Sequence, residues 1–265
     1  MTLARAVRLY LQLLSLHLRA LMEYEYDFWI MAAGTLLTQV VNLVFISALF
    51  ARVPALNGWS YWAVVAMFGL LAVAEGVGSL CFEGTWRIAE AINTGSLDYL
   101  LVRPYPVVLQ VTSAEVGVNG LTNVVTGGIM IGAALVNAGI AWSPARVLVG
   151  LVLLLSAVTI KLAINLATNC VSFWLSSPNP HFAMAVHQVG DLARFPISIY
   201  PPALKVVLGV VVPFAFVTVF PVGFVMGMGT RPWLGLLTPV VAALCLAVAL
   251  FVFRTGLRRY ESAGN

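Results

Sequence analysis

The stretch VLVGLVLLLSAVTIKLAINLATNCVSFWL, residues 147–175, is apolar apart from a few small polar side chains and one charge, at Lys161. A helix of about 20 apolar residues crosses a hydrocarbon core of about 30 Å, so this stretch is long enough to span a membrane. The whole chain of 265 residues is 61% hydrophobic and 9% charged, whereas globular domains carry about 25% charged residues. Together with a mean hydropathy of +0.98, this composition predicts an integral membrane protein.

Five further apolar runs are long enough to span a membrane, and the alternating pattern of a β-barrel is absent from the sequence. The sequence therefore predicts an all-α membrane protein with six transmembrane helices. Pro213 and Pro221 interrupt the fifth run, which indicates either a kinked span or a broken, partly re-entrant one. The six predicted spans are residues 30–50, 59–80, 106–136, 147–175, 203–227 and 233–253.

The first 29 residues form an N-terminal segment that precedes the six-span domain of residues 30–265. Arg5, Arg8 and Arg19 fall on one stripe of a helix whose other faces are mostly leucine. This pattern predicts an amphipathic helix in the cytoplasmic membrane interface rather than a cleavable signal peptide. A plain anchor and a grip on a partner fit the pattern equally well.

Arginine and lysine residues are distributed unevenly between the two sides that six spans create. Ten lie on the side of the N-terminus, three lie on the other side, and Lys161 lies within a span. This bias predicts a multi-pass protein of the plasma or inner membrane with both termini in the cytoplasm. It explains the net charge of +4 without nucleic-acid binding. The ten are Arg5, Arg8, Arg19, Arg87, Arg103, Arg194, Lys205, Arg254, Arg258 and Arg259, and the three are Arg52, Arg146 and Arg231.

Apart from Lys205 at the start of the fifth run, three charged residues fall within the predicted spans, where ionisable side chains usually face a bundle interior or an aqueous path. Glu75 and Glu115 lie close enough to the ends of their spans to contact water. Lys161 is about 20 Å from either end of its span at 1.5 Å per residue. Lys161 therefore requires a partner or a wet cavity.

Two polar ridges, each with one residue in every four, follow the third and fourth predicted spans. Such spacing keeps the side chains near one helix face, so we hypothesise that the ridges face each other and that Glu115 pairs with Lys161. The ridges are either interhelical glue or the lining of a translocation or gating path. In the second case, replacing Lys161 with methionine should spare assembly and impair transport. The ridges are Glu115, Asn119 and Asn123, and Lys161, Asn165 and Asn169.

The connector between the second and third predicted spans, residues 83–105, concentrates charge in an otherwise apolar chain. Residues 83–94 have a helical pattern with a polar stripe, and Gly95 is placed to end that helix in the left-handed conformation. A second short helix is predicted to begin after Ser96 and to end before Pro104. The connector is therefore expected to contact a partner on the cytoplasmic side.

The cysteine and histidine residues offer no catalytic or metal-binding pattern. Cys81, Cys170 and Cys245 show no paired spacing, which argues against a disulfide framework or a zinc site. His187 and Asp191 lie four residues apart, a spacing more typical of a solvated helix face than of a catalytic dyad. No enzymatic activity, metal or cofactor is expected in this chain.

Four segments carry a resemblance to a known family. They are INTGSLDYLLVRPYP (residues 92–106), FPISIYP (195–201), PFAFVTVFPVGFVMG (213–227) and the terminal YESAGN (260–265). With six spans, an N-terminal interfacial helix and a cytoplasmic helix between spans two and three, the chain resembles the permease subunits of ABC-2-type ABC exporters. More narrowly, it is similar to the viologen- or multidrug-exporter-type branch.

The resemblance implies that residues 83–94 are a coupling helix that docks on a separate ATP-binding subunit. ATP and Mg²⁺ would bind to that ABC ATPase, because this chain has no GxxxxGK[ST] phosphate loop. Two ATPases would work with two permeases, identical or homologous, in a lipid bilayer. The expected coupling residues are Trp86, Ile88 and Ile92 for apolar contacts and Glu83, Arg87 and Glu90 for polar contacts.

The resemblance also implies export by alternating access, with an amphiphilic or cationic drug-like small molecule as substrate. Pro213, Pro221 and the glycine-rich residues 221–230 are candidates for an external gate, and residues 195–202 for the cytoplasmic entrance of the fifth span. The alternative functions are an accessory subunit without its own transport path and an intramembrane enzyme. The scattered histidines disfavour the enzyme.

Overall fold

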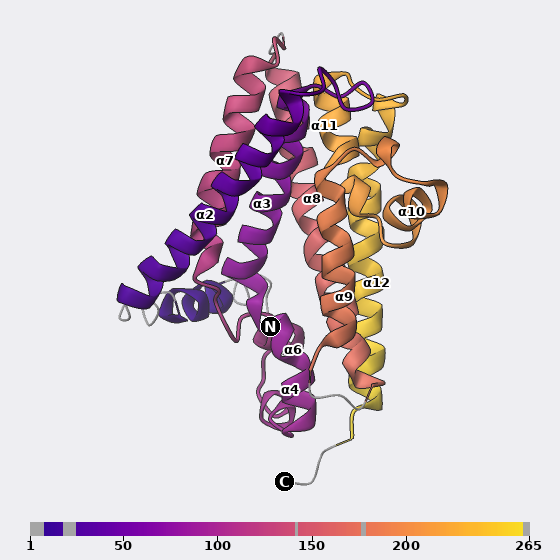
Figure 1. Cartoon of the computed structure of the whole chain (residues 1–265). Coiled ribbons are helices and arrows are strands. Elements are labelled where there is room, and N and C mark those ends of the chain that lie inside the picture. The colour runs from indigo at the N-terminus through magenta and orange to yellow at the C-terminus, as the bar shows by residue number, and fades with distance from the viewer. Residues whose placement is uncertain (1–7, 18–24, 141–142, 176–178, 262–265) are drawn as a thin grey trace.

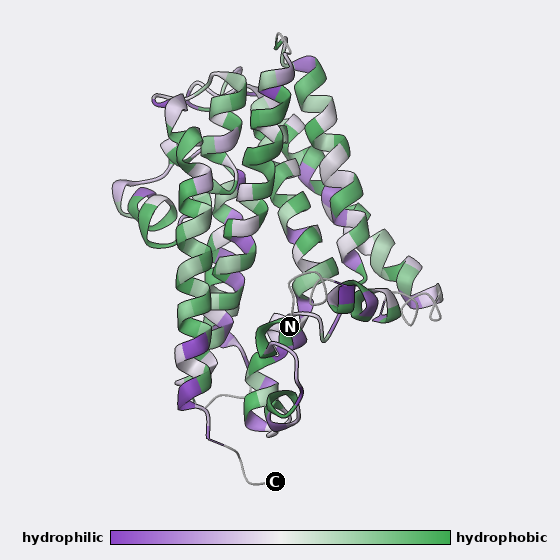
Figure 2. Ribbon diagram, turned by 180° about the vertical axis from the view of Figure 1, so that it is seen from behind, coloured by the Kyte–Doolittle hydropathy of each residue, from purple (hydrophilic) through white to green (hydrophobic). Residues whose placement is uncertain are grey.

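The computed structural model describes residues 8–17, 25–140, 143–175 and 179–261. These residues form helices joined by turns, and no strand occurs among them (Figure 1). Figure 2 shows apolar residues along the long helices, and hydrophilic residues at the end of the C-terminal helix. The predicted all-α membrane protein is confirmed. Arg5 and Arg19 of the predicted N-terminal stripe lie outside the described residues.

Five of the described helices are long and apolar enough to cross a membrane. The first four run alternately up and down the bundle, and α12 runs in the same direction as α8, toward the end that carries the C-terminus (Figure 1). We call the end that carries residues 83–105 the connector end, and the other the opposite end. The five helices are α2 (Glu25–Phe50), α3 (Tyr61–Phe82), α7 (Asn119–Asn137), α8 (Pro144–Asn169) and α12 (Thr238–Arg259).

The chain between α8 and α12 is broken into short helices. Residues 202–211 and 214–226 bend by 69° at a break that contains Pro213. Proline has no N–H to continue the helical ladder and restricts the preceding residue, which explains the break at this position. The elements are η2 (Cys170–Phe173), α9 (His181–Asp191), η3 (Leu192–Arg194), η4 (Ile197–Ile199), α10 (Pro202–Val206), η5 (Val207–Val211), η6 (Phe214–Phe216), α11 (Val219–Met226) and η7 (Pro232–Leu237).

The third apolar run, predicted as one span over residues 106–136, is divided in two. It forms α6 (Val107–Thr112), a non-helical segment at 113–118 and then α7. Within the break, the Gly117 N–H donates a hydrogen bond to the carbonyl of Ser79 at 2.7 Å. The Gly117 N–H is thus bonded to α3 and not to a carbonyl within its own helix. Glu115 therefore lies outside the helix that was predicted to contain it.

Helix α3 is the centre of the bundle and packs against both α7 and α8. Two pairs of glycines bring α3 and α7 close together. A Cβ on Gly76 would lie 2.6 Å from the carbonyl oxygen of Gly120, and a Cβ on Gly127 would lie 2.6 Å from that of Gly69. Small residues of this kind let membrane helices approach closely. Helix α2, by contrast, has only 6% of its spanning window buried.

A helix over residues 8–17 lies across the connector end of the bundle (Figure 1). The Tyr10 hydroxyl donates a hydrogen bond to the carbonyl of Cys81, and its ring centroid lies 6.1 Å from that of Phe82. Burial raises the pKa of Tyr10 to about 12. The helix is thus attached to the end of α3, while its placement in a membrane interface stays a prediction.

Candidate functional site

The connector folds as three short helices at one end of the molecule (Figure 1). They are η1 (Glu83–Arg87), α4 (Ile88–Asn93) and α5 (Leu97–Leu101). The single α-helix predicted over 83–94 begins instead with a 3₁₀ turn. Gly84 packs against the carbonyl of Val111 in α6, where a Cβ would not fit. Gly95 has φ of 71°, which confirms the left-handed helix end.

Arg87 joins the connector to the segment that precedes α7. Its Nε lies 2.7 Å from Glu115 Oε2, and its Nη2 lies 3.2 Å from Glu115 Oε1, a bidentate arrangement. Its Nη1 lies 2.8 Å from Glu90 Oε2. The Arg87 side chain is 57% exposed, so each pair contributes little to stability. Glu83, four residues before Arg87, does not pair with it and instead accepts a hydrogen bond from Ser79.

The outer face of the connector differs from the predicted coupling face. Ile88 is 1% exposed, so its assignment to a partner contact was wrong: the residue packs inside its own chain. Glu83 and Trp86 turn toward a cavity, whereas Arg87 and Glu90 are exposed and Ile92 is half-buried. Two residues that sequence reasoning missed are the most exposed apolar ones here, Tyr99 at 70% and Val102 at 82%. The apolar run LDYLLV within a charged connector was the available signal.

A cavity of about 710 Å³ lies beside α3 and opens to the outside. Its walls come from α2, α3, η1, α7, α8, α9 and η3. Many lining side chains carry charges or hydrogen-bonding groups, although the helices that bear them are apolar overall. The polar lining comprises Thr35, Thr38, Gln39, Asn42, Glu75, Ser79, Glu83, Asn119, Asn123, Lys161, Asn165, His187, Asp191 and Arg194.

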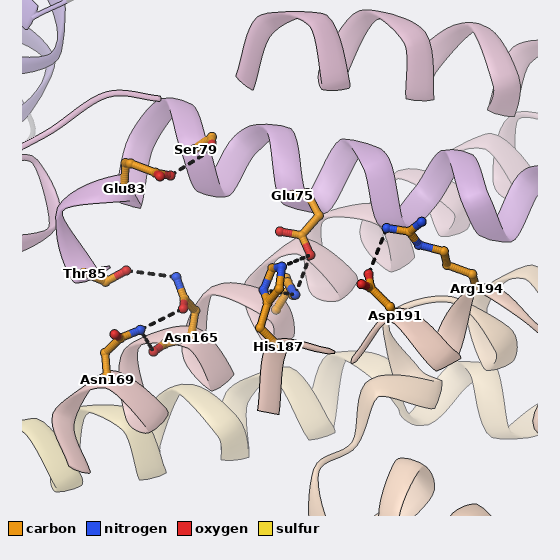
Figure 3. A network of polar contacts seen from close by, with 10 residues as sticks. Glu75, Ser79, Glu83, Thr85, Asn165, Asn169, His187, Asp191 and Arg194 are labelled. Carbon is orange, nitrogen blue, oxygen red and sulfur yellow. Dashed lines mark hydrogen bonds and ion pairs between the residues drawn. The ribbon is translucent and has the colours of Figure 1, made fainter. Parts of the chain in front are cut away.

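An ion cluster lies in this cavity at the middle of α8 (Figure 3). Lys161 Nζ lies 2.5 Å from Glu75 Oε1 and 3.3 Å from His187 Nδ1. His187 Nε2 lies 3.8 Å from the same Glu75 oxygen. The Lys161 side chain is 6% exposed, and its ammonium lies 5.2 Å from the centre of the Phe214 ring. Glu75 is thus the partner that Lys161 was predicted to require. His187 also belongs to the ion cluster, and sequence reasoning missed it.

The predicted Glu115–Lys161 pair was wrong, and among the described residues no hydrogen bond or ion pair joins the two polar ridges, although residues of both line the same cavity. Helix α3 packs against both ridge-bearing helices and supplies the partner of Lys161. Asn165 Nδ2 donates to Thr85 Oγ1 at 2.9 Å, and Asn169 Nδ2 donates to Asn165 Oδ1 at 2.9 Å. On the other side of the cavity, Gln39 Nε2 of α2 donates to Asn123 Oδ1 at 3.0 Å.

The segment after α8 approaches the bundle more deeply than a cytoplasmic connector would. Arg194 pairs with Asp191 at 2.8 Å, and its guanidinium lies 5.9 Å from the Phe68 ring centre within α3. Asn57, in the loop between α2 and α3, donates a hydrogen bond to the carbonyl of Ser198 at 3.1 Å.

Three placements at the cytoplasmic side were therefore wrong: those of Arg194, Lys205 and residues 195–202. Contacts with Phe68 hold Arg194 in the bundle, and contacts with the loop between α2 and α3 hold the 195–202 segment at the opposite end. Lys205 lines a pocket with Asn57 and Arg231 at that same end. The proline-rich segment crosses the bundle early because α9 carries the chain inward beside α8 (Figure 1).

The candidate gate residues lie in two environments. Pro213 stands at the break between η5 and η6, and Pro221 is buried in α11. The loop after α11 packs against Trp59 at the opposite end of the bundle. In the described part of the chain, Cys81, Cys170 and Cys245 are free thiols, and no three His, Cys, Asp or Glu side chains are grouped to hold a metal ion.

Membrane-length helices around a polar cavity, with charges in that cavity and a folded connector at one end, define the chain as a multi-pass membrane protein. Comparison with family models gives the narrower class. The chain matches the ABC-2 family transporter protein over residues 36–264, and it belongs to that family. The recognition of an ABC-2-type permease is confirmed. Membership implies pairing with an ABC ATPase. No curated protein and no solved structure matches the chain.

Proposed function

We propose that the chain is the permease subunit of an ATP-driven exporter in which the polar cavity forms one wall of the translocation path. The observation that carries this proposal is the position of Trp86. Trp86 belongs to η1 of the connector, yet its ring lies 5.5 Å from that of His187 in the ion cluster. A displacement of the connector would therefore reach the charged cavity through one side chain.

The cavity requires a second permease to close it. Helix α2 is the least buried spanning helix, but it contributes Thr35, Gln39 and Asn42 to the cavity lining. Polar side chains that faced lipid would be costly, so we infer that another permease, identical or homologous, covers this face. Alternating access would then open the path between the two permeases. The break at Pro213 and the glycine-rich loop after α11 are candidate hinges for its outer gate.

The exposed face of the connector is the proposed contact for the ABC ATPase, which would bind ATP and Mg²⁺. Arg87 and Glu90 supply charge, and Tyr99 and Val102 supply the apolar surface. Aromatic and arginine side chains are the usual anchors of protein interfaces. Two ATPases, one on each permease, would complete the transporter, and both chain termini would lie in the cytoplasm of a cell membrane.

Val102→Asp is expected to reduce copurification of the permease with its ATPase at least about tenfold, because a charge would be placed in an apolar contact. The ABC ATPases encoded beside the permease gene would be coexpressed and captured through the permease. Val136→Asp is the matched control, since Val136 is 81% exposed but lies at the opposite end of α7. The proposed contact between the connector and the ATPase would be contradicted if Val102→Asp captured as much ATPase as the wild type. It would also be contradicted if Val136→Asp lost as much capture as Val102→Asp.

An amphiphilic cation is the substrate class that the cavity chemistry supports. Glu83 and Trp86 line the cavity together, and no basic side chain among the described residues forms an ion pair with Glu83. A carboxylate beside an aromatic ring attracts an organic cation through charge and through the ring face.

Glu83→Gln is therefore expected to raise the concentration of organic cation needed for half-maximal ATPase stimulation about five- to thirtyfold, which corresponds to roughly 1–2 kcal/mol. The assay uses the permease–ATPase complex in proteoliposomes. Stimulation by an uncharged analogue of the same shape serves as the control and should change little. A variant that responds to the cation like the wild type would argue against Glu83 as a substrate contact.

A further inference from the structure

A second polar cavity, of about 580 Å³, lies at the opposite end of the bundle. It is bounded by the loop between α2 and α3, by the 195–202 segment, by α11 and by the loop at 227–231. It shares no lining residue with the cavity that holds the ion cluster. The loop at 227–231 is also a candidate hinge of the outer gate, but none of the residues that line this cavity lines the proposed transport path.

The charge of this second cavity is entirely positive. Lys205 and Arg231 line it from separate parts of the chain, and none of its lining residues is acidic. Among the described residues, neither cation forms an ion pair. The described segments at this end contain no aspartate or glutamate: residues 51–60, 138–140, 195–206 and 227–237. Two cations without a counterion in the chain favour an anionic ligand.

Backbone donors add to the two cations. Gly227 and Gly229 adopt left-handed conformations with φ of 66° and 85°. Along the described chain, the N–H groups of Gly229, Thr230 and Arg231 donate to no backbone carbonyl. Successive free N–H groups in such a turn form a concavity that binds anions. A side chain at Gly229 would also press on the Trp59 ring, whose nearest atom lies 3.0 Å from a built Cβ.

The level of the cavity in the membrane indicates where the anion comes from. The cavity is lined by Trp59, just before the start of α3, and by Leu234 of η7 (Pro232–Leu237), just before α12. A cavity at the level where spanning helices begin is expected to lie at the headgroup layer. Trp233, two residues after Arg231, is 56% exposed, as expected of an interfacial aromatic anchor. Ile197, Phe220 and Leu234 give the same cavity an apolar wall.

We propose that this cavity binds an anionic phospholipid. Lys205, Arg231 and the backbone of 229–231 hold the phosphate group, and the apolar wall receives the glycerol and the upper acyl chain. The site goes beyond the proposed transport function and does not depend on ATPase coupling. It can therefore be tested on the full-length permease alone, separately from transport.

The test is a titration of the purified permease with phosphatidylglycerol, and with phosphatidylcholine of the same chains, followed by native mass spectrometry. Each cation near a membrane surface contributes about 1 kcal/mol, or about fivefold in affinity. Lys205→Gln with Arg231→Gln is therefore expected to weaken phosphatidylglycerol binding roughly 25-fold and to leave phosphatidylcholine binding unchanged. Arg52→Gln with Arg146→Gln removes equal charge from the same end outside this cavity, and should bind like the wild type.

Two further arms make the test decisive. Lys205→Arg with Arg231→Lys keeps both charges and should retain phosphatidylglycerol binding. Lys205→Gln alone and Arg231→Gln alone should each lose about fivefold in affinity for phosphatidylglycerol. These single variants keep the test valid if the double glutamine variant does not fold. Inorganic phosphate is expected to bind much more weakly than the lipid. Phosphate binding as tight as that of the lipid, or equal losses in the Arg52 and Arg146 control, would overturn the proposal.

Discussion

Replacing Lys161 with methionine is expected to lower the free energy of unfolding by about 3–5 kcal/mol, the usual cost of removing one partner of a buried ion pair. Lys161 is nearly inaccessible, and its ammonium is 2.5 Å from the Glu75 carboxylate. Without it, the His187 ring, 3.8 Å away, is the one ion-pair partner left to that carboxylate among the described residues. Thermal and denaturant unfolding of the purified permease in one detergent would measure the change. We therefore expect this substitution to destabilise the permease, and no longer expect it to spare assembly.

The double variant Glu75→Gln with Lys161→Met separates stability from transport. It removes both charges, so it is expected to recover most of the lost stability. If it is stable but does not transport, the ion cluster belongs to the path; if it transports normally, the cluster only holds helices together. A single Lys161→Met variant as stable as the wild type would contradict the buried pair itself.

Replacing Gly127 with leucine is expected to separate α3 from α7 and to cost about 3 kcal/mol or more, since overpacking a well-packed contact costs about 1–3 kcal/mol and occasionally more. The first atom of the new side chain would already lie 2.6 Å from the carbonyl oxygen of Gly69 and 2.9 Å from the amide nitrogen of Val73. Both are backbone atoms, so relief requires a shift of the whole helix. The unfolding midpoint and the fraction of monodisperse protein after heating would report it.

The neighbouring Gly128 provides the control for this substitution. It lies on the same helix, but a Cβ there meets nothing within 4 Å. Gly128→Leu should therefore change stability by no more than about 0.5 kcal/mol, as is usual for substitutions away from packed contacts. If both variants were equally stable, the glycine contact between α3 and α7 would not exist in the membrane.

Composition and run length were sufficient to predict the membrane class and most of the long helices. The run at 147–175 contains α8 nearly whole, and the second and sixth runs overlap α3 and α12 over most of their lengths. Hydropathy predicts these helices because an apolar segment of about 20 residues is long enough to cross the hydrocarbon core as a helix. The narrow family resemblance came from short motifs, and the family match bears it out at the level of the ABC-2 permease.

Helix breaks inside apolar runs were harder to predict. The break at 113–118 depends on a hydrogen bond from Gly117 to Ser79, a residue far away in the sequence. The position of residues 195–202 depends on α9, whose short and less apolar sequence resembles an exposed connector. A hydropathy pattern contains no information about such long-range contacts. The prediction from hydropathy therefore joined α6 and α7 into one span and placed the proline-rich segment at the wrong end of the bundle.

The sequence predicted several residues of the candidate site correctly but not the contacts that these residues make with one another. Glu75, Lys161 and Asn165 were selected from their depth and spacing, and all three line one cavity. The error was to assume that the third and fourth predicted spans are neighbours. Helix order in a bundle is not encoded in spacing along one helix, and α3 lies where the Glu115–Lys161 contact was expected. His187 was missed because its partners come from two other helices.

The glycine contacts between α3 and α7 have a mechanical consequence. Helix α3 ends where residues 83–118 begin, and α7 starts where they end. Because this segment is attached at both ends to one closely packed pair of helices, we expect a displacement of the connector to move α3 and α7 together. With 22 residues, α3 is about 33 Å long at 1.5 Å per residue, so such a movement would extend from one end of the bundle to the other.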